Sequence, residues 1–339
     1  MTSYNSHKTK IIYVDESAFG DITGKTFNSD GTVMNKVQAF SPDAENSMIF
    51  SKGIGEGRDF TETNYGNFMA RCSITYNPTN FDFLKFAIGP KSGAGSTASH
   101  YELTEADDIS YAGSGIETFS MAVSEETGTT DDVDVWSGCI INDFSVTGTI
   151  GGLLSCSVNV FAKTVVHETT AYTTTFTSER PFVCNNITLA WGTGTPSTVA
   201  KVQNFSVDFS NNVIDIRQLG DRFTADYDLG DRTYNFTITA IWNSALVGSA
   251  GLLHDDWLGT GTGSPSTAAI PPSSRLMNLT ISEGSSSGDK NAIIYLTDCA
   301  INRATKPVNV GEGRIEVTYT GQARTGGNTN KPIAYWTTT

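Results

Sequence analysis

The sequence has few of the residues from which catalytic and metal sites are usually built. It contains only four histidines, and none lies at metal-ligand spacing from another His or Cys. The H-E-x-x-H and P-loop motifs are missing, and we expect no nucleophile elbow of the G-x-S-x-G type. The five cysteines form no C-x-x-C pair, and their odd number argues against a full set of disulfides. We therefore expect buried free thiols, no cofactor, no metal and no enzymatic activity.

Three other groups of residues are weaker candidates for ligand binding. His254-Asp255-Asp256 could attract a metal, but adjacent residues on a helix point about 100° apart. The glycine-rich stretches 192–194 and 259–263 lack the lysine and the strand-to-helix context of a phosphate loop. Acidic residues at 105–108 and 131–134 match no twelve-residue calcium loop, although a structural Ca²⁺ remains open.

Positive charge is also scarce. The chain has 22 Lys and Arg against 36 Asp and Glu, which gives a net charge of −14. Such a surface lacks the cationic footprint of a nucleic-acid binder. It is either an ordinary acidic surface or one along which a polyanion moves without sticking. No run reaches ~18 apolar residues and the N-terminus does not resemble a secretory signal, so we expect synthesis in the cytoplasm and no membrane partner.

The sequence does contain an internal repeat, in which one pattern of residues occurs twice. Residues 37–43 return as 202–208 with five of seven positions identical, a shift of 165 residues. Further matches keep the same order with shifts of 160 to 165: 58–61 with 221–224, 65–75 with 229–239, 139–142 with 299–302, and 152–162 with 313–323. Two copies of a domain-sized unit explain this spacing, and we assign them to residues 1–175 and 176–339.

The local pattern is mostly that of β-strands. Strands are expected at 71–76, 138–146, 153–161, 201–209, 234–242, 292–296 and 314–320, where apolar residues alternate with polar ones or β-branched and aromatic residues are frequent. One helix candidate follows the same strand in each copy: residues 80–88, bounded by Asn77-Pro78-Thr79 and Gly89-Pro90, and residues 245–257. The fold class is mainly β, with two antiparallel sheet units that each carry one helix.

A long connection rich in Gly, Ser and Thr follows each helix, at about 91–134 and 259–290. Apolar residues in such loops indicate docking on a partner, or they fold back on their own domain. We take six of them as candidate self-assembly residues: Tyr101, Tyr111, Phe119, Met121, Ile270 and Leu276. Residues 168–184 are expected to link the two copies.

The second copy resembles a known family. A strand at 201–209 ends in Asn211-Asn212, a Leu219-Gly220 turn and Asp221-Arg222 follow, and 230–239 forms a second strand before an apolar helix. This order resembles the tail tube protein, or major tail protein, of long-tailed bacterial or archaeal viruses. The likeness extends over both copies but is weaker in the first.

The resemblance implies a β-sandwich or barrel whose inner sheet joins those of neighbouring subunits around a DNA channel. Most members form hexameric rings, so a duplicated chain would close a pseudo-hexamer with three copies. The implied partners are the chain itself and other tail proteins: the tape measure, the tail terminator and the tail tip. Genomic DNA would pass through the lumen without specific binding, and the protein would reside in the virion tail.

Two other functions remain open at this point. Capsid decoration proteins, fibres and surface-layer components are also acidic, Thr-rich and built from repeated strands. A carbohydrate-active β-sandwich enzyme would need converging carboxylates in a cleft. Asp226, Asp228 and Asp231 are the best candidates for such a site, although their spacing is also typical of a turn.

Overall fold

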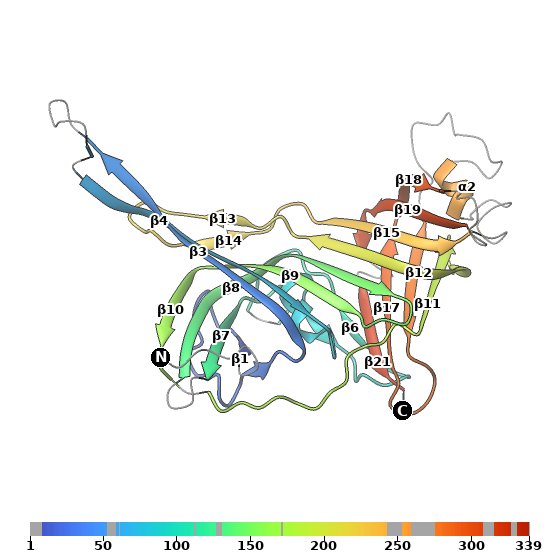
Figure 1. Ribbon diagram of the computed structural model, residues 1–339, viewed down its shortest axis with the longest axis horizontal. Helices are drawn as coiled ribbons and strands as arrows, with labels where there is room; N and C mark the ends of the chain where they lie inside the picture. Colours follow the sequence, from blue (N-terminus) through green and yellow to red (C-terminus); the bar gives the residue numbers. More distant parts are fainter. Residues whose placement is uncertain are drawn as a thin grey trace.

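Antiparallel β-strands make up most of the chain (Figure 1). The computed structural model describes residues 9–52, 59–60, 62–111, 113–126, 131–170, 172–242, 253–258, 275–307, 315–326 and 331–338. The seven stretches expected to be strands each overlap an observed one, so these predictions are confirmed. The reason is the alternation of apolar and polar side chains, which places one face of each strand on the core.

A central sheet runs through the whole molecule. Its eight strands lie in the order β3 (Val37–Ser51), β4 (Glu62–Tyr76), β9 (Ser155–Ala162), β8 (Asp131–Thr149), β12 (Ser197–Ser210), β15 (Thr233–Ile241), β19 (Glu316–Ala323) and β18 (Ala300–Thr305), and all neighbours are antiparallel. The pairing of β8 with β12 joins the N-terminal and C-terminal groups of strands. In this internal seam, Phe144 lies opposite Phe209 and their rings stack with centroids 4.4 Å apart.

Two further groups of strands flank the central sheet. On the N-terminal side these are β2 (Thr32–Val33), β1 (Thr9–Asp15), β7 (Phe119–Glu126), the first part of β8, and β10 (Thr164–Glu168). On the C-terminal side they are the first part of β12, β11 (Asn186–Gly192), β16 (Leu276–Ser282), β17 (Lys290–Thr297), β20 (Thr325–Gly326), β21 (Ile333–Thr337), β6 (Tyr101–Leu103) and β5 (Lys91–Ser92). Each group covers the apolar face of the central sheet and closes a core.

Strand β8 serves both the central sheet and a flanking group because it bends at Gly138. The φ of Gly138 is 63°, a value that side-chain-bearing residues rarely adopt. Its N–H donates to Oε1 of the buried Glu16 at 2.7 Å, and the same carboxylate accepts from Thr118 at 2.5 Å and Ser120 at 2.6 Å. Glu16 therefore fixes the bend from inside the core. A second bend separates β17 from β18 at Asp298, whose φ is 53°.

The helices are short. A 3₁₀ turn (Asp82–Leu84) leads into α1 (Lys85–Ile88), which packs against β8, and α2 (Leu253–Leu258) packs against β18. The helix expected at 80–88 is present but shorter, since its first turn is a 3₁₀ helix, and Phe81, Phe83 and Phe86 are all buried. Of the second expected helix, 245–257, the part 245–252 lies outside the described residues, and α2 overlaps the remainder. In the part of the chain that the structure describes, no helix is long and apolar enough to cross a membrane.

The two long connections contain more structure than expected. Strand β7 lies within the first and β16 within the second, so the prediction of loops there is wrong for 119–126 and 276–282. β7 is almost entirely buried, whereas β16 alternates between half-buried and buried residues, and Gly, Ser and Thr flank both strands. The expected link at 168–184 is mostly without regular structure, although Tyr172, Phe182 and Cys184 are buried.

All five cysteines are free and buried, which confirms the expectation of inert thiols. Burial raises the pKa of Cys72 and Cys156 to about 12 and that of Cys184 to about 11. The thiolate that oxidants and metals react with is therefore scarce at neutral pH.

Candidate assembly surface

The central sheet has one apolar and one polar face. Phe144, Val207 and Ile238 point into the core, whereas the opposite face presents short hydroxyl, amide and carboxylate side chains. Hydrogen bonds connect these groups across strands: Thr75 with Ser157 at 3.4 Å, Ser145 with Ser206 at 3.5 Å and Thr239 with Thr318 at 2.9 Å. Asn159 also donates to Asp143 at 2.5 Å, beside a shallow hollow that Asp208 and Asn235 line.

Cations are rare on this polar face. By the alternation and pairing of the described strands, Arg71 of β4 and Arg303 of β18 share the face with Asp43, Asp143, Asp208 and Glu316. Arg71 lies with its guanidinium 4.7 Å from the centre of the Phe161 ring. Arg303 stands at the end of the sheet and is exposed. The face is therefore polar and acidic, with hydroxyl groups in the majority.

The sheet has two outer edges. In the described part of the chain, β3 pairs only with β4 and β18 pairs only with β19. Each outer edge thus presents backbone N–H and C=O groups, which is the usual template for pairing with another strand. Glu45 lies along the β3 edge and Arg303 along the β18 edge, so the two edges carry opposite charges at these positions.

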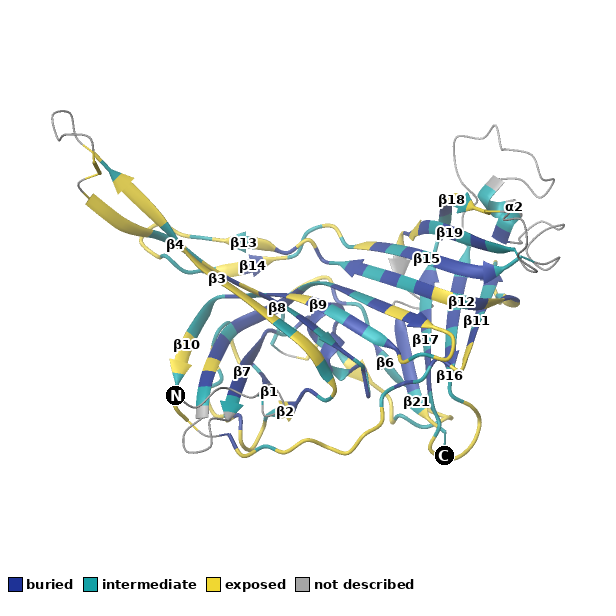
Figure 2. Cartoon of the chain, in the orientation of Figure 1, coloured by how far each residue is buried: buried dark blue, intermediate teal, exposed yellow. Residues whose placement is uncertain are grey.

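A projecting hairpin extends β3 and β4 far beyond the body of the molecule (Figure 1). We call residues 46–67 the first arm. Figure 2 shows that its outer part is exposed on both faces. Five of its large apolar side chains are more than half exposed: Met48, Ile49, Phe50, Phe60 and Tyr65.

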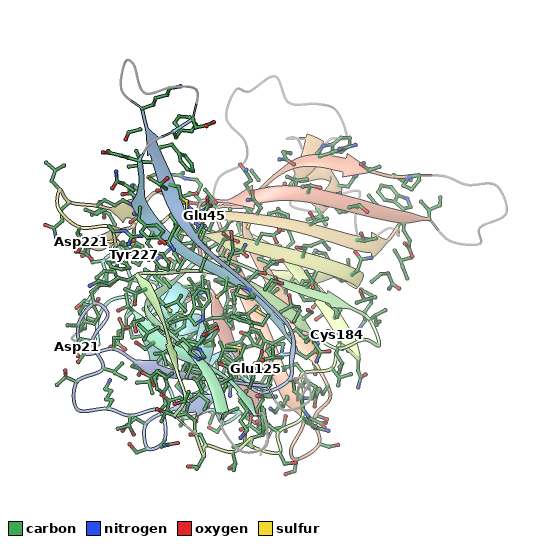
Figure 3. The ribbon with its side chains drawn as sticks, turned by 60° about the vertical axis from the view of Figure 1, so that its left-hand side comes forward. Asp21, Glu45, Glu125, Cys184, Asp221 and Tyr227 are labelled. Atoms are coloured by element: carbon green, nitrogen blue, oxygen red, sulfur yellow. The ribbon has the colours of Figure 1, made fainter. Side chains whose placement is uncertain are left out.

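The corresponding excursion between β12 and β15, residues 211–232, is folded down on the molecule, and we call it the second arm. It contains the small hairpin β13 (Ile214–Ile216) and β14 (Asp226–Asp228). Val213 and Tyr227 are buried against Ala106, Ile116 and Ile140. Burial raises the pKa of the Tyr227 hydroxyl well above its usual value. Figure 3 shows Asp221 and Tyr227 on this arm, with Glu45 on the neighbouring β3.

The tip of the second arm contacts the base of the first arm. Arg222 donates from Nε to the carbonyl of Gly66 at 2.9 Å and from Nη2 to Asn46 at 2.5 Å. Its guanidinium also lies 5.0 Å from the centre of the Tyr65 ring. The backbone N–H of Phe68 donates to the carbonyl of Arg222 at 3.0 Å. This crossing holds the two excursions together within one chain.

The residues proposed for self-assembly occupy different environments. Phe119 and Met121 are fully buried in β7, so they belong to the core. Tyr101 of β6 is half-buried against Tyr335, and Tyr111 shares a hydrogen bond with Thr118 at 3.1 Å. Leu276 is half-buried at the start of β16, and Ile270 lies outside the described residues. The five described residues do not form one surface, and neither the outer edges nor the arms follow from the sequence alone.

Within the described residues, His, Cys, Asp and Glu form no group of three at metal-binding distance. Asp226 and Asp228 flank Tyr227 on β14, where their carboxylates accept hydrogen bonds from the backbone N–H of Tyr227 and Leu229 at 2.8 and 2.9 Å. These carboxylates thus cap local backbone groups in the arm.

Comparison with known proteins identifies the chain. The family model described as phage tail tube protein matches residues 6–323. No curated protein matches the sequence. A family match over this length defines a structural protein of the phage tail rather than an enzyme. The chain belongs to the phage tail tube protein family, and it is a structural component of the virion tail.

Proposed function

We propose that three copies of this chain close into a pseudo-hexameric ring and that rings stack into the tail tube. In this proposal residues 1–175 and 176–339 are two equivalent units, each an antiparallel sheet unit with one flanking helix. The internal seam between β8 and β12 then repeats between chains, where β18 of one chain pairs with β3 of the next. Three chains with two units each give six positions around the ring.

The strand order supports two equivalent units. The first half of the central sheet reads β3, β4, β9, β8 and the second reads β12, β15, β19, β18, in the same order and direction. The flanking pairs correspond as well, since β1–β7–β8–β10 matches β11–β16–β17–β20. Even the register agrees: Phe40 lies opposite Ile74, and Phe205 opposite Ile238, at the positions that the sequence matches.

Irregularities recur at matching positions too. A register shift between Val37 and Ala39 has its counterpart between Val202 and Asn204. Another between Ile141 and Asp143 corresponds to one between Ile301 and Arg303. The bend at Gly138 corresponds to the bend at Asp298, and a Cys follows each. Because bulges are specific local features of a fold, their recurrence favours duplication over coincidence.

The internal seam supplies the register for the seam between chains. Inside the chain Asp143 faces Ser210 and Phe144 faces Phe209. In the seam between chains, β18 takes the place of β8, with a shift of 160 residues, and β3 takes the place of β12, with a shift of 165. Arg303 then lies opposite Glu45 of the next chain, and Ala304 lies opposite its Ala44. The Arg303–Glu45 pair joins opposite charges, and small residues allow close approach at the adjacent pair. This charge complementarity is the observation that carries the ring proposal.

The polar face of the central sheet is our proposal for the lumen. A closed ring turns one face of its sheet toward the axis, and the apolar face is already covered by the flanking strands. Hydroxyl and amide groups give DNA few fixed cations to bind, so passage meets little resistance. Arg71 is stacked on Phe161, and Arg303 would be neutralised by Glu45 in the seam. Capsid decoration, fibre or surface-layer roles have no comparable requirement for this face.

Further partners follow from the family and stay proposals: the tape measure, the tail terminator and the tail tip protein. A role in ring stacking for Tyr101, Tyr111 and Leu276 likewise stays a prediction, as does one for Ile270. No specific DNA contact and no membrane contact are part of the proposal.

Electron microscopy of the purified protein with light-scattering mass on the same sample tests the ring. Annular particles or tubes with a central hole, and a ring mass of three chains, are the expected result. A mass of six chains per ring would contradict the proposal that each chain supplies two positions. A monomer at high concentration, even after addition of tail-tip protein, would contradict self-assembly into a tube.

A further inference from the structure

Among the residues that the structure describes, the first arm carries the most exposed large apolar side chains. Beyond the crossing with Arg222, the two strands of the arm pair with each other and, in the described part of the chain, with no other strand. Phe60 is 66% exposed and Phe50 is 53% exposed, and their ring centroids lie 5.5 Å apart. Met48 and Tyr65 lie opposite each other on the same hairpin and are also exposed. Apolar side chains grouped in this way mark an interaction surface.

The second arm shows how such an excursion is covered. It starts from β12 and β15, crosses the internal seam, and lies over the neighbouring half, where Tyr227 packs near Ile140 of β8 and Phe161 of β9. Its tip then reaches β4, where the Phe223 ring contacts the Phe68 ring with centroids 5.5 Å apart. An arm from one half is therefore buried on the half that lies across the seam.

The two arms also correspond in sequence. Residues 58–61 match 221–224, so Phe60 stands where Phe223 stands in the second arm. The first arm leaves the sheet beside β3, the outer edge, and within the chain no half lies across that edge. The β-bulge between Asn46 and Met48 lies at the base of this arm, at a position where a strand pair can twist toward a neighbour.

We propose that the first arm docks on the second half of a neighbouring copy of this chain, across the seam between β18 and β3. The first arm covers the half across the seam between chains, as the second arm covers the half across the seam within one chain. Met48, Phe50, Phe60 and Tyr65 become buried over β18 and β19 of the neighbour, beside that neighbour's second arm. This inference rests on the proposed ring, since it requires a second half next to β3.

The inference explains why two matching excursions have opposite surroundings. The second arm finds its partner surface inside the chain, and so it is folded down, with Tyr227 buried and Phe223 half-buried. The first arm would cover the second half of a neighbouring chain, and that surface is present only after assembly. The apolar residues of the first arm are thus buried at the seam between chains, whereas those of the second arm are buried at the seam inside a chain.

A photocrosslinker at position 60 tests the location directly. Benzoylphenylalanine replaces Phe60, and rings are assembled from a mixture of ordinary and ¹⁵N-labelled chains before irradiation. Crosslinked peptides should come from residues 176–338 of a different chain, which the mixed isotopes identify. Crosslinks only within one chain, or only to residues 1–175 of another chain, would overturn the proposal.

A paired substitution tests the contribution to assembly. Phe50→Ser with Phe60→Ser should leave the unassembled chain with its normal melting temperature, because both side chains are exposed, yet ring formation should fall at least tenfold. Leu219→Ser is the matched control, since Leu219 is fully exposed at the tip of the second arm. It should assemble normally. Normal rings that fail to stack would overturn lateral docking in favour of contacts between rings, and normal tubes would overturn any role of the arm.

The failure of this proposal can be told from the failure of the ring. The mass of wild-type rings decides the three-chain proposal before any variant is made. The crosslink and the paired substitution are then scored against wild-type rings of known mass. A three-chain ring with an arm that crosslinks elsewhere would leave the ring intact and reject the docking alone.

Discussion

The two arms of this chain leave the central sheet at matching positions in the two halves, but they differ in how far their side chains are buried. The second arm is folded onto the first half and buries Tyr227, which is 5% exposed. The first arm continues its two strands outward and leaves Tyr65 63% exposed. On our proposal the surfaces differ because only the second arm has its neighbour in the same chain. The uncovered apolar side chains of the first arm then indicate where a second copy docks.

The largest difference between the arms should appear on removing one aromatic ring from each. Tyr227→Ala should cost about 3–5 kcal/mol of unfolding free energy, because it leaves a cavity among Ala106, Ile116 and Ile140. Tyr65→Ala should cost at most about 1 kcal/mol, since the exposed ring loses little beyond its contact with Arg222. Urea unfolding of the unassembled chain measures both. Equal losses would mean that the arms do not differ in burial.

A second contrast lies at the two bends of the sheet. Gly138→Ala should destabilise by about 2–3 kcal/mol, because a side chain costs energy at positive φ and its Cβ would lie 2.7 Å from Cβ of Lys163. Asp298→Gly should be neutral or stabilise by up to about 1 kcal/mol, because Gly adopts this φ without strain. Thermal melts of both variants make the comparison. Destabilisation by Asp298→Gly would show that the Asp side chain, rather than the backbone, maintains the second bend.

The sequence predicted one part of this architecture well. Strands with one wet face, such as β12 and β15, show clear alternation, and the match of Phe40 with Phe205 placed equivalent strands in register. Strand β7 was missed because both of its faces are buried, so Met121, Ala122 and Val123 form an apolar run without alternation. The same burial made Phe119 and Met121 look like docking residues in a loop.

The assembly surface was harder to predict because it depends on contacts distant in sequence. Whether an arm is folded down is decided by what lies across the seam, such as Ile140 for Tyr227, and no local pattern reports this. Glu16 gave no signal either, although its carboxylate holds Gly138 from a distance of more than a hundred residues along the chain. The charges of Glu45 and Arg303 acquire meaning only once the sheet order is known.

The crossing between the arms should be sensitive to one arginine. Arg222→Ala removes the hydrogen bonds to Gly66 and Asn46 and should cost about 1–2 kcal/mol. Amide hydrogen exchange at residues 65–68 should rise with it, because the Phe68 N–H is bonded to the carbonyl of residue 222. Arg303→Ala at the outer edge is the matched control and should change neither quantity in the unassembled chain. Unchanged exchange in Arg222→Ala would show that the first arm is held without the second.

The smallest expected effect per contact is at the outer edges. Substitutions there should weaken the seam between chains and leave the internal seam unchanged. Glu45→Arg places a positive charge opposite Arg303 of the next chain and should cost about 1 kcal/mol per seam, or roughly a fivefold loss in association. Arg303→Glu should do the same, and the double variant should restore assembly because the pair is only reversed. Light scattering across a concentration series gives the shift, which should shrink in high salt as screening increases. Because neither residue takes part in the β8–β12 pairing, the stability of the single chain should stay constant throughout. Single variants that assemble normally, or a double variant that fails to recover, would mean that β18 and β3 do not meet in the proposed register.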